Sequence, residues 1–277
     1  MRYPSRVVRR LSLPAALLVA LVALVGLSGC TPQKQSNARA DYQTNLDRTI
    51  EGSRLRTLSL RTGAGSIEIV GEESRRTIEI VGIVSTHAET FGEAKRIAGE
   101  VRLNVQAEGT ENPIVRVTEP RLSSTDQYYS YDLTVKVPHN CQISLEDSSG
   151  PIEVGGLVSG LRIENESGPV SVETVTGGIV IQTAGNRTTV KDASGHLQIK
   201  DGAGDIDVAG VTGDVEIQDG GGKLVVQNVS GDVTASDNPT GAQMKNIDGD
   251  VTLIRIEPAT SKIQGVTGNL SYPSGTQ

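Results

Sequence analysis

The chain has 277 residues, and its 33 acidic side chains outnumber the 26 basic ones to give a formal net charge of −7 at pH 7. This acidic balance excludes a protein that binds nucleic acid or an anionic lipid surface through basic patches. Trp is absent, Phe occurs once and Gly occurs 32 times. We therefore expect a core of small branched aliphatic residues, which favour β-strands.

The amino terminus has the pattern of a targeting segment. Residues 1–10 carry four arginines and no acidic side chain, and an apolar run of thirteen residues follows at 15–27. This run is too short to span a bilayer comfortably as a helix. A basic start before a short apolar core predicts a secretory signal peptide at residues 1–29. Its removal leaves 26 − 4 = 22 basic residues against 33 acidic ones.

The signal segment ends in Leu27-Ser28-Gly29-Cys30, which resembles the lipobox of bacterial lipoproteins. The resemblance implies that the Cys30 sulfur carries a diacylglycerol, that the chain is cut before Cys30 and that the new amine is acylated. Two or more acyl chains hold a protein firmly on a membrane, so the membrane is an expected partner. By the same resemblance, Thr31 in place of Asp favours the outer membrane of a Gram-negative organism, on its periplasmic or its surface face. The alternative is a plain secretory signal that happens to contain a cysteine.

Residues 30–50 are polar and are predicted to form a flexible tether behind the lipidated cysteine. Residues 51–140 follow as a less regular β region, because short segments such as Ile78-Glu79-Ile80 alternate apolar and charged side chains. One short helix is expected at residues 86–98, where Thr86 and Glu89 fit a capping box. The residues that share its apolar face are Ala88, Phe91, Ala94 and Ala98. We expect this region to cap one end of the structure that follows.

Residues 141–272 repeat every eighteen residues. Five apolar columns stay in register through six repeats, and one of them is Leu157, Val175, Ala193, Val211, Val229 and Ile247. A fixed period of this length is typical of a solenoid, whose coils bury their apolar side chains against each other. The pattern predicts an all-β fold, a parallel right-handed β-solenoid with 18-residue coils. A glycine column is expected at one sharp corner, at Gly177, Gly195, Gly213, Gly231 and Gly249.

The end of the repeat is marked by Glu257-Pro258-Ala259, which interrupts the period. The apolar residues after it resume one residue out of step, at Ile263, Val266 and Leu270. Because an open strand edge recruits other chains, we expect both ends of the solenoid to be protected. Residues 273–277 are assigned to a tail.

Two segments at the start of the coils carry a family resemblance. Val135-Lys136-Val137-Pro138 ends one strand, and Ser149-Gly150-Pro151-Ile152-Glu153-Val154 leads into the Gly-rich coils. In this pattern the chain resembles a bacterial family of putative adhesin β-solenoids, catalogued as a domain of unknown function. The resemblance covers about residues 50–272 and implies the solenoid fold. It supplies no catalytic residues, because none are established for the family.

The outward-facing side chains of the coils share no chemistry. One outward column is Glu153, Ser171, Thr189, Asp207, Val225 and Gln243, and it places no two acids side by side. The sequence lacks the paired carboxylates of glycosidases, histidines at metal-ligand spacing and a phosphate-binding loop. We therefore expect no catalytic, cofactor-binding or metal-binding residue, and no cofactor.

Two irregular places are candidates for a partner surface. Tyr128, Tyr129 and Tyr131 cluster ahead of the coils, with Tyr129 expected to face opposite to the other two and at least one of the three expected in the core. Asn186 and Arg187 belong to a turn after which Thr188 interrupts an apolar column. The Thr188 hydroxyl is expected to bond to the backbone in a bulged corner.

These observations favour a non-enzymatic, lipid-anchored protein of the cell envelope, an adhesin or a binding and scaffolding module. Its partner would be an envelope protein or glycan, and a role in envelope-stress signalling is left open. Solenoids that stack end to end into a filament are an alternative, against which export and protected ends argue. A glycan-processing β-helix enzyme is a second alternative, which would depend on acids such as Asp205 and Asp207.

Overall fold

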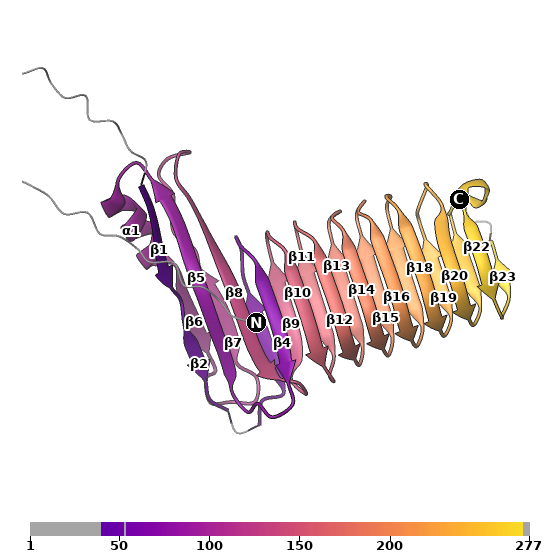
Figure 1. Cartoon of the computed structure of the whole chain (residues 1–277), viewed down its shortest axis with the longest axis horizontal. Helices are drawn as coiled ribbons and strands as arrows, with labels where there is room; N and C mark the ends of the chain where they lie inside the picture. Colours follow the sequence, from indigo (N-terminus) through magenta and orange to yellow (C-terminus); the bar gives the residue numbers. More distant parts are fainter. Residues whose placement is uncertain (1–39, 53, 274–277) are drawn as a thin grey trace, which may run out of the picture. The chain divides into compact units, whose positions relative to one another are not determined.

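The computed structural model describes residues 40–52 and 54–273. The predicted signal peptide, Cys30 and residues 274–277 therefore lie outside the described residues. Within the described range the strands form two sheets, accompanied by the helix α1 (Phe91–Glu100) and the 3-10 helix η1 (Pro258–Thr260) (Figure 1).

The first sheet holds twelve strands. Their spatial order is β1 (Ala40–Asn45), β5 (Ile78–Ala88), β8 (Tyr128–Pro138), β4 (Ile67–Glu72), β10 (Ile152–Leu157), β12 (Val170–Thr176), β14 (Thr188–Ser194), β16 (Ile206–Thr212), β18 (Leu224–Ser230), β20 (Ala242–Asp248) and β22 (Lys262–Val266), with β2 (Arg48–Ile50) beside β5.

The second sheet holds eleven strands. Their spatial order is β23 (Leu270–Ser271), β21 (Val251–Ile254), β19 (Val233–Ser236), β17 (Val215–Asp219), β15 (Leu197–Asp201), β13 (Ile179–Thr183), β11 (Leu161–Asn165), β9 (Gln142–Asp147), β3 (Thr57–Arg61), β7 (Ile114–Thr118) and β6 (Arg102–Gln106).

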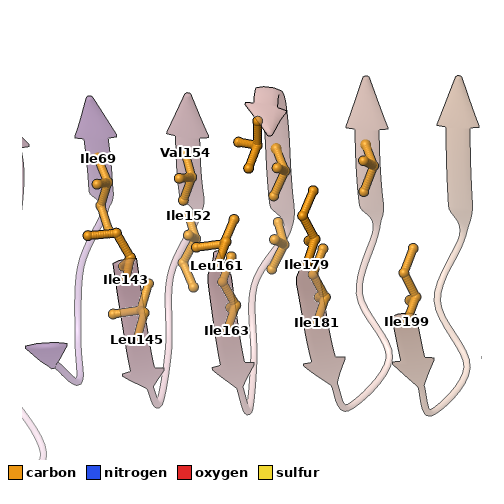
Figure 2. Close-up of a cluster of buried hydrophobic side chains, with 14 of the residues drawn as sticks. Ile69, Ile143, Leu145, Ile152, Val154, Leu161, Ile163, Ile179, Ile181 and Ile199 are labelled. Atoms are coloured by element: carbon orange, nitrogen blue, oxygen red, sulfur yellow. The ribbon is translucent and has the colours of Figure 1, made fainter. Parts of the chain in front are cut away.

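Each coil gives one strand to each sheet, from the β9–β10 coil to the β21–β22 coil. Successive coils pair in parallel with a shift of eighteen residues, so that Leu161 lies opposite Ile179 and Ile179 opposite Leu197. The apolar columns are buried between the sheets, where Figure 2 shows Ile143, Leu161 and other members side by side. The predicted β-solenoid and its columns are confirmed.

Glycine is required at this corner for two reasons, the backbone angle and the close approach of the neighbouring coil. Gly213 has a φ of 131°, a conformation that residues with a Cβ rarely adopt. A Cβ on Gly213 would also lie 2.4 Å from the Gly195 carbonyl oxygen, and one on Gly195 would lie 2.3 Å from that of Gly177. The stacked glycines therefore allow the coils to approach to strand-pairing distance.

The solenoid starts earlier in the chain than the predicted boundary at residue 141. The strands β3 and β4 form a coil that pairs with β9 and β10, placing Ile67 opposite Ile152. On its other side this coil pairs with β7 and β8, where Ile67 lies opposite Leu133. A coil of residues 57–72 thus sits between one from residues 114–138 and one from residues 142–157. The eighteen-residue period does not predict this arrangement, because the strands that pair here are far apart in sequence.

An antiparallel cap covers the amino-terminal end of the stack. In it β5 pairs with β8 and β1, and β6 pairs with β7. The prediction of a flexible tether up to residue 50 is therefore wrong for residues 40–50, which form β1 and β2. Tyr42 and Leu46 pack against the core from this segment. The polar side chains of this segment suggested a tether. A polar sequence can still form an edge strand, because strand pairing uses the backbone.

The single helix is confirmed, but its start lies five residues later than predicted. Its N-cap is Thr90, whose hydroxyl accepts a hydrogen bond from the Glu93 amide at 3.3 Å. Thr86 belongs to β5, and its hydroxyl donates to the Ala94 carbonyl at 2.8 Å. Ala94 and Ala98 are buried as expected, whereas Phe91, the first residue of the helix, is 57% exposed.

The carboxyl-terminal end of the stack is not covered in the same way. Ile263 pairs with Met244 and Leu270 with Val251, a shift of nineteen that confirms the predicted change of register. Among the described strands none pairs with the outer edges of β22 or β23. Leu270 is 43% exposed. The expectation that both ends are protected is met only at the cap.

Candidate functional site

A column of polar side chains is buried at one corner of the coils, where each strand of the second sheet ends. Its members are Asp147, Asn165, Thr183, Asp201, Asp219 and Asn238, all at most 8% exposed. They recur every eighteen residues, with one extra residue before the last. Sequence reasoning missed this column because it followed only apolar residues, although the same period carries the signal.

Several members of the column form hydrogen bonds to the turn that follows them and to the column member of a neighbouring coil. Asp201 accepts a hydrogen bond from the Thr183 hydroxyl at 2.8 Å and a second from the Gly204 amide at 2.9 Å, one on each carboxylate oxygen. Asp219 is satisfied in the same way by the Gly221 amide and the Asn238 side chain. Backbone groups freed where a strand ends need such partners. At these positions the column is explained by structure alone.

Asp147 is the exception among the carboxylates of the column. Its Oδ1 accepts from the Thr62 hydroxyl at 2.6 Å, but its buried Oδ2 has no hydrogen-bond partner within the described residues. Burial raises the pKa of the Asp147 carboxyl to about 6, although the Thr62 hydroxyl and nearby backbone amides act in the opposite direction. The negative charge of Glu119 contributes to the same rise in pKa. An unsatisfied buried acceptor is unfavourable.

Asp147 lines a groove of about 410 Å³ that crosses the ends of β3, β9, β11 and β13. None of the residues that line it is aromatic, and they are Arg61, Thr62, Glu146, Asp147, Ser148, Glu164, Asn165, Glu166, Gln182, Thr183 and Ala184. Four of them are acidic. Arg61 is the one basic residue of this lining, and its side chain pairs with Glu146 at 3.1 Å.

The remaining acids of the groove differ in their partners. Glu164 pairs with Arg162, which lies outside the lining. Neither Asp147 nor Glu166 has an ion-pair partner in the part of the chain that the structure describes. The groove therefore presents two uncompensated carboxyl groups, of which one is buried and one is exposed.

The three predicted surface tyrosines do not form one patch. Tyr131 is fully buried, and its hydroxyl oxygen accepts a hydrogen bond from the Gly63 amide. Tyr129 is partly buried against the cluster under α1, so it shares the inner face with Tyr131. The expected facing was wrong, because side chains two residues apart in a strand lie on the same face. Burial raises the pKa of both phenols.

Only Tyr128 belongs to the outer face of the cap, where it is 55% exposed. Its ring stacks on His87 with 4.9 Å between the ring centroids. The His87 Nδ1 lies 2.6 Å from an Asp41 carboxylate oxygen, so the three side chains form a row across β1, β5 and β8. Ile83, at 48% exposed, adds apolar surface to this face.

The predicted irregular turn is exposed, but it lies apart from the cap. Asn186 and Arg187 are both exposed, and Arg187 pairs with Asp205 at 3.1 Å. The strand after the turn, β14, is separated from β8 by β4, β10 and β12. Hydrogen bonding from the Lys223 amide, together with the Arg187 charge, lowers the pKa of Asp205.

Thr188 does not behave as predicted. It lies within β14, in register with Val170 and Ile206, rather than in a bulged corner. Its hydroxyl is fully buried and has no hydrogen-bond partner among the described residues. The backbone that it was expected to contact is used in strand pairing, with the Thr188 amide donating to the Asp205 carbonyl at 2.8 Å.

Residues 40–52 and 54–273 contain no group of three or more His, Cys, Asp or Glu side chains placed to hold a metal ion. None of their helices is long and apolar enough to cross a membrane. Cys141 is buried, and burial raises the pKa of its thiol to about 11.

These features define a two-sheet parallel β-solenoid whose buried polar corner opens at Asp147 into an acidic groove. The chain belongs to the Toastrack DUF4097 family, which matches residues 102–276, more than half of its length. No protein of curated function matches it.

Three solved structures are similar at low identity. A putative cell adhesion protein from Clostridium sporogenes is 12% identical with a TM-score of 0.42, over 61% of this chain and 99% of that one. A putative adhesin from Bacteroides fragilis is 13% identical with a TM-score of 0.37, over 83% and 97%. A putative adhesin from Parabacteroides distasonis is 9% identical with a TM-score of 0.36, over 83% and 97%. At this level no residue of these proteins can be matched to a residue here.

Proposed function

We propose that this protein is a non-enzymatic binding module of the bacterial cell envelope, held at a membrane by lipid on Cys30. The observation that carries the binding role is the groove at Asp147, whose lining holds four acidic side chains and one basic side chain. The anchor rests on the sequence Leu27-Ser28-Gly29-Cys30 behind an apolar segment.

The rest of the coil surface supports a scaffold role. The outward column from Glu153 to Gln243 lies in register as predicted, and it changes from acid to hydroxyl to apolar side chain along the stack. Reaction centres need several groups placed around one point. The acid that a glycan-processing enzyme would need at Asp205 is paired with Arg187 and hydrogen-bonded to the Lys223 amide. A rigid support for one or two binding surfaces is the simpler role.

An adhesin, the name given to the similar structures, is the version of this function in which the partner belongs to another cell. A scaffold within the envelope is the other version. Both require a surface that contacts a partner, and the candidates are the groove and the outer face of the cap around Tyr128.

Photo-crosslinking in intact cells tests the proposal. The photoreactive residue is placed at Glu166 in the groove, at Tyr128 on the cap, or at Glu216 as an exposed control on a coil face. We expect a discrete adduct with another envelope component from Glu166 or Tyr128, and none from Glu216. If all three positions give only the unmodified chain, the binding role is wrong.

A filament is a second candidate, favoured by the uncovered edges of β22 and β23. An unpaired strand edge can be extended by a strand of another molecule. A photoreactive residue at Lys262 would then crosslink copies of the chain, and particle size would grow with concentration. A chain that stays monomeric at high concentration would exclude the filament and leave the binding module unaffected.

A further inference from the structure

We infer that two copies of this chain pair tail to tail through the open ends of their solenoids, and that the assembly closes at two copies. Three features of the last coil carry this inference, which goes beyond the proposed binding role and does not depend on it. The last coil has two unpaired strand edges, its inward apolar side chains are partly exposed, and the two ends of β22 carry opposite charges.

The last coil exposes apolar side chains of the kind that the other coils bury. Ile263 and Leu270 are in register with Met244 and Val251 of the preceding coil. Met244 and Val251 are at most 1% exposed, whereas Leu270 is 43% exposed and Ile263 is half-buried. The difference arises because no described strand pairs with the outer edge of β22 or β23, at the yellow end of Figure 1. The end of the stack therefore presents apolar surface between two unpaired strand edges.

The same end of a second copy fits this surface. The edges of β22 and β23 belong to different sheets, and packed sheets lie about 10 Å apart. A partner has to pair with both edges while it covers the apolar side chains between them. One extended strand of another protein can pair with only one of the two edges. The open end of another copy has two edges at the same spacing, so it can pair with both at once.

The charges along β22 favour an antiparallel pair related by a two-fold axis. Lys262 is exposed at the first residue of β22. The exposed Asp248 lies beside the other end of β22, where its Oδ1 accepts a hydrogen bond from the Thr267 hydroxyl at 2.8 Å. A two-fold axis across β22 brings the Lys262 end of each strand to the Asp248 end of its partner. Such pairs at the rim of an interface add little affinity, but they select the orientation.

The cap at the amino-terminal end explains why the assembly closes at two copies. The apolar residues at this end, Ala88, Ala94 and Ile97, are fully buried between the strands and α1. The cap therefore lacks the exposed apolar surface that the last coil presents. A tail-to-tail pair uses the same surface on both copies and leaves no open end for a third. A filament would instead require the open end to pair with the cap of the next copy.

Disulfide trapping tests the two-fold arrangement on the full chain in non-ionic detergent. Gln264 is exposed at the middle of β22, so the two-fold axis brings it close to Gln264 of the other copy. Opposite residues of antiparallel strands have Cα atoms about 4.5–5.5 Å apart, within the range that a disulfide spans. We expect Gln264→Cys to give a disulfide-linked dimer under mild oxidation. Glu216→Cys, on an exposed coil face, and the native chain, whose Cys141 is buried, should give none.

Sedimentation equilibrium measures the same association without a crosslink. The interface is small, because the last coil offers fewer than the roughly 20–30 residues of a standard interface on each side. We therefore expect a reversible dimer of the native chain with a dissociation constant in the micromolar range. Leu270→Lys places a charge in the interface and should raise this constant about tenfold or more. Val158→Lys, at a residue that is 51% exposed on another coil, should leave it unchanged, and circular dichroism checks that both variants are folded.

Two results would overturn the inference. One is a yield of linked dimer from Gln264→Cys no greater than that from Glu216→Cys, an outcome that does not depend on how Leu270→Lys folds. The other is a native chain that stays monomeric at about 100 μM, well above a micromolar dissociation constant. Species larger than a dimer would contradict closure at two copies and favour the filament. None of these results bears on the binding role of the groove.

Discussion

The side chain of Asn165 is hydrogen-bonded through both its amide nitrogen and its oxygen, whereas Asp147, in register with it one coil earlier, leaves Oδ2 unpaired. The two residues occupy equivalent places in the repeat, so the repeat itself provides the reference for what the corner needs. Asp201 and Asp219, further along the same column, use both carboxylate oxygens. The deviation at Asp147 coincides with the acidic groove.

Asp147→Asn is expected to stabilise the fold at neutral pH. Burial raises the Asp147 pKa from 3.8 to about 6, so the folded chain holds a proton that the unfolded chain releases between these values. Stability therefore falls as pH rises from about 4 to about 6, and the cost at pH 7.5 is about 1–3 kcal/mol. The gain from the substitution should be largest above pH 6 and should shrink toward pH 4. Urea unfolding at several pH values measures it, and an equal gain at all pH values would contradict the account.

Gly213→Ala is expected to disrupt the stack locally. The new Cβ would lie 2.4 Å from the Gly195 carbonyl, and the backbone at φ 131° is strained for any residue but glycine. A loss of about 2–4 kcal/mol in unfolding free energy is expected. The matched control is Gly178→Ala near the same corner, where a Cβ has no neighbour within 4 Å. Equal losses for the two variants would show that the corner does not pack as described.

Thr188→Val should stabilise the protein. The Thr188 hydroxyl is buried without a partner, and its neighbours in register, Val170 and Ile206, are apolar. Replacing it by an isosteric methyl group should add about 1 kcal/mol. Thr183→Val is the opposite case, because the Thr183 hydroxyl donates to Asp201, and it should lose stability. A thermal unfolding comparison in which both variants shift in the same direction would refute this explanation.

Cys30→Ser tests the anchor. If Cys30 carries lipid, the substitution should move the protein from the membrane fraction to the soluble fraction or leave it as an uncleaved precursor. Metabolic labelling with a fatty acid, followed by fractionation, distinguishes these outcomes. Labelling that persists in the variant would show that the lipid is attached elsewhere.

Much of the fold could be predicted from the sequence because its contacts repeat at a constant interval. The columns through Leu161, Ile179 and Leu197 fix both the strands and their register. The repeat pattern does not predict that β3 and β4 lie between their neighbours, because the residues that pair, such as Ile67 and Leu133, belong to no repeat. Polar composition also concealed β1, whose pairing depends on backbone hydrogen bonds.

The candidate site was less accessible to sequence reasoning. Of the five residues proposed for a partner surface, Tyr128, Asn186 and Arg187 are exposed, but the sequence could not show that Tyr128 lies on a different surface from the other two. The groove depends on Thr62 and Asp147, which are brought together only when β3 pairs with β9. Whether a buried carboxylate has one or two partners depends on the turn around it, and that geometry is not encoded in a spacing.

The most direct test of the central claim is photo-crosslinking in cells from Gln182, at the edge of the groove. The experiment compares a photoreactive residue at Gln182 with one at Glu216 on an exposed coil face. We predict a discrete adduct with another envelope component from Gln182 and none from Glu216. Adducts of equal yield from the two positions, or no adduct from Gln182, would contradict the claim that this groove is a binding surface.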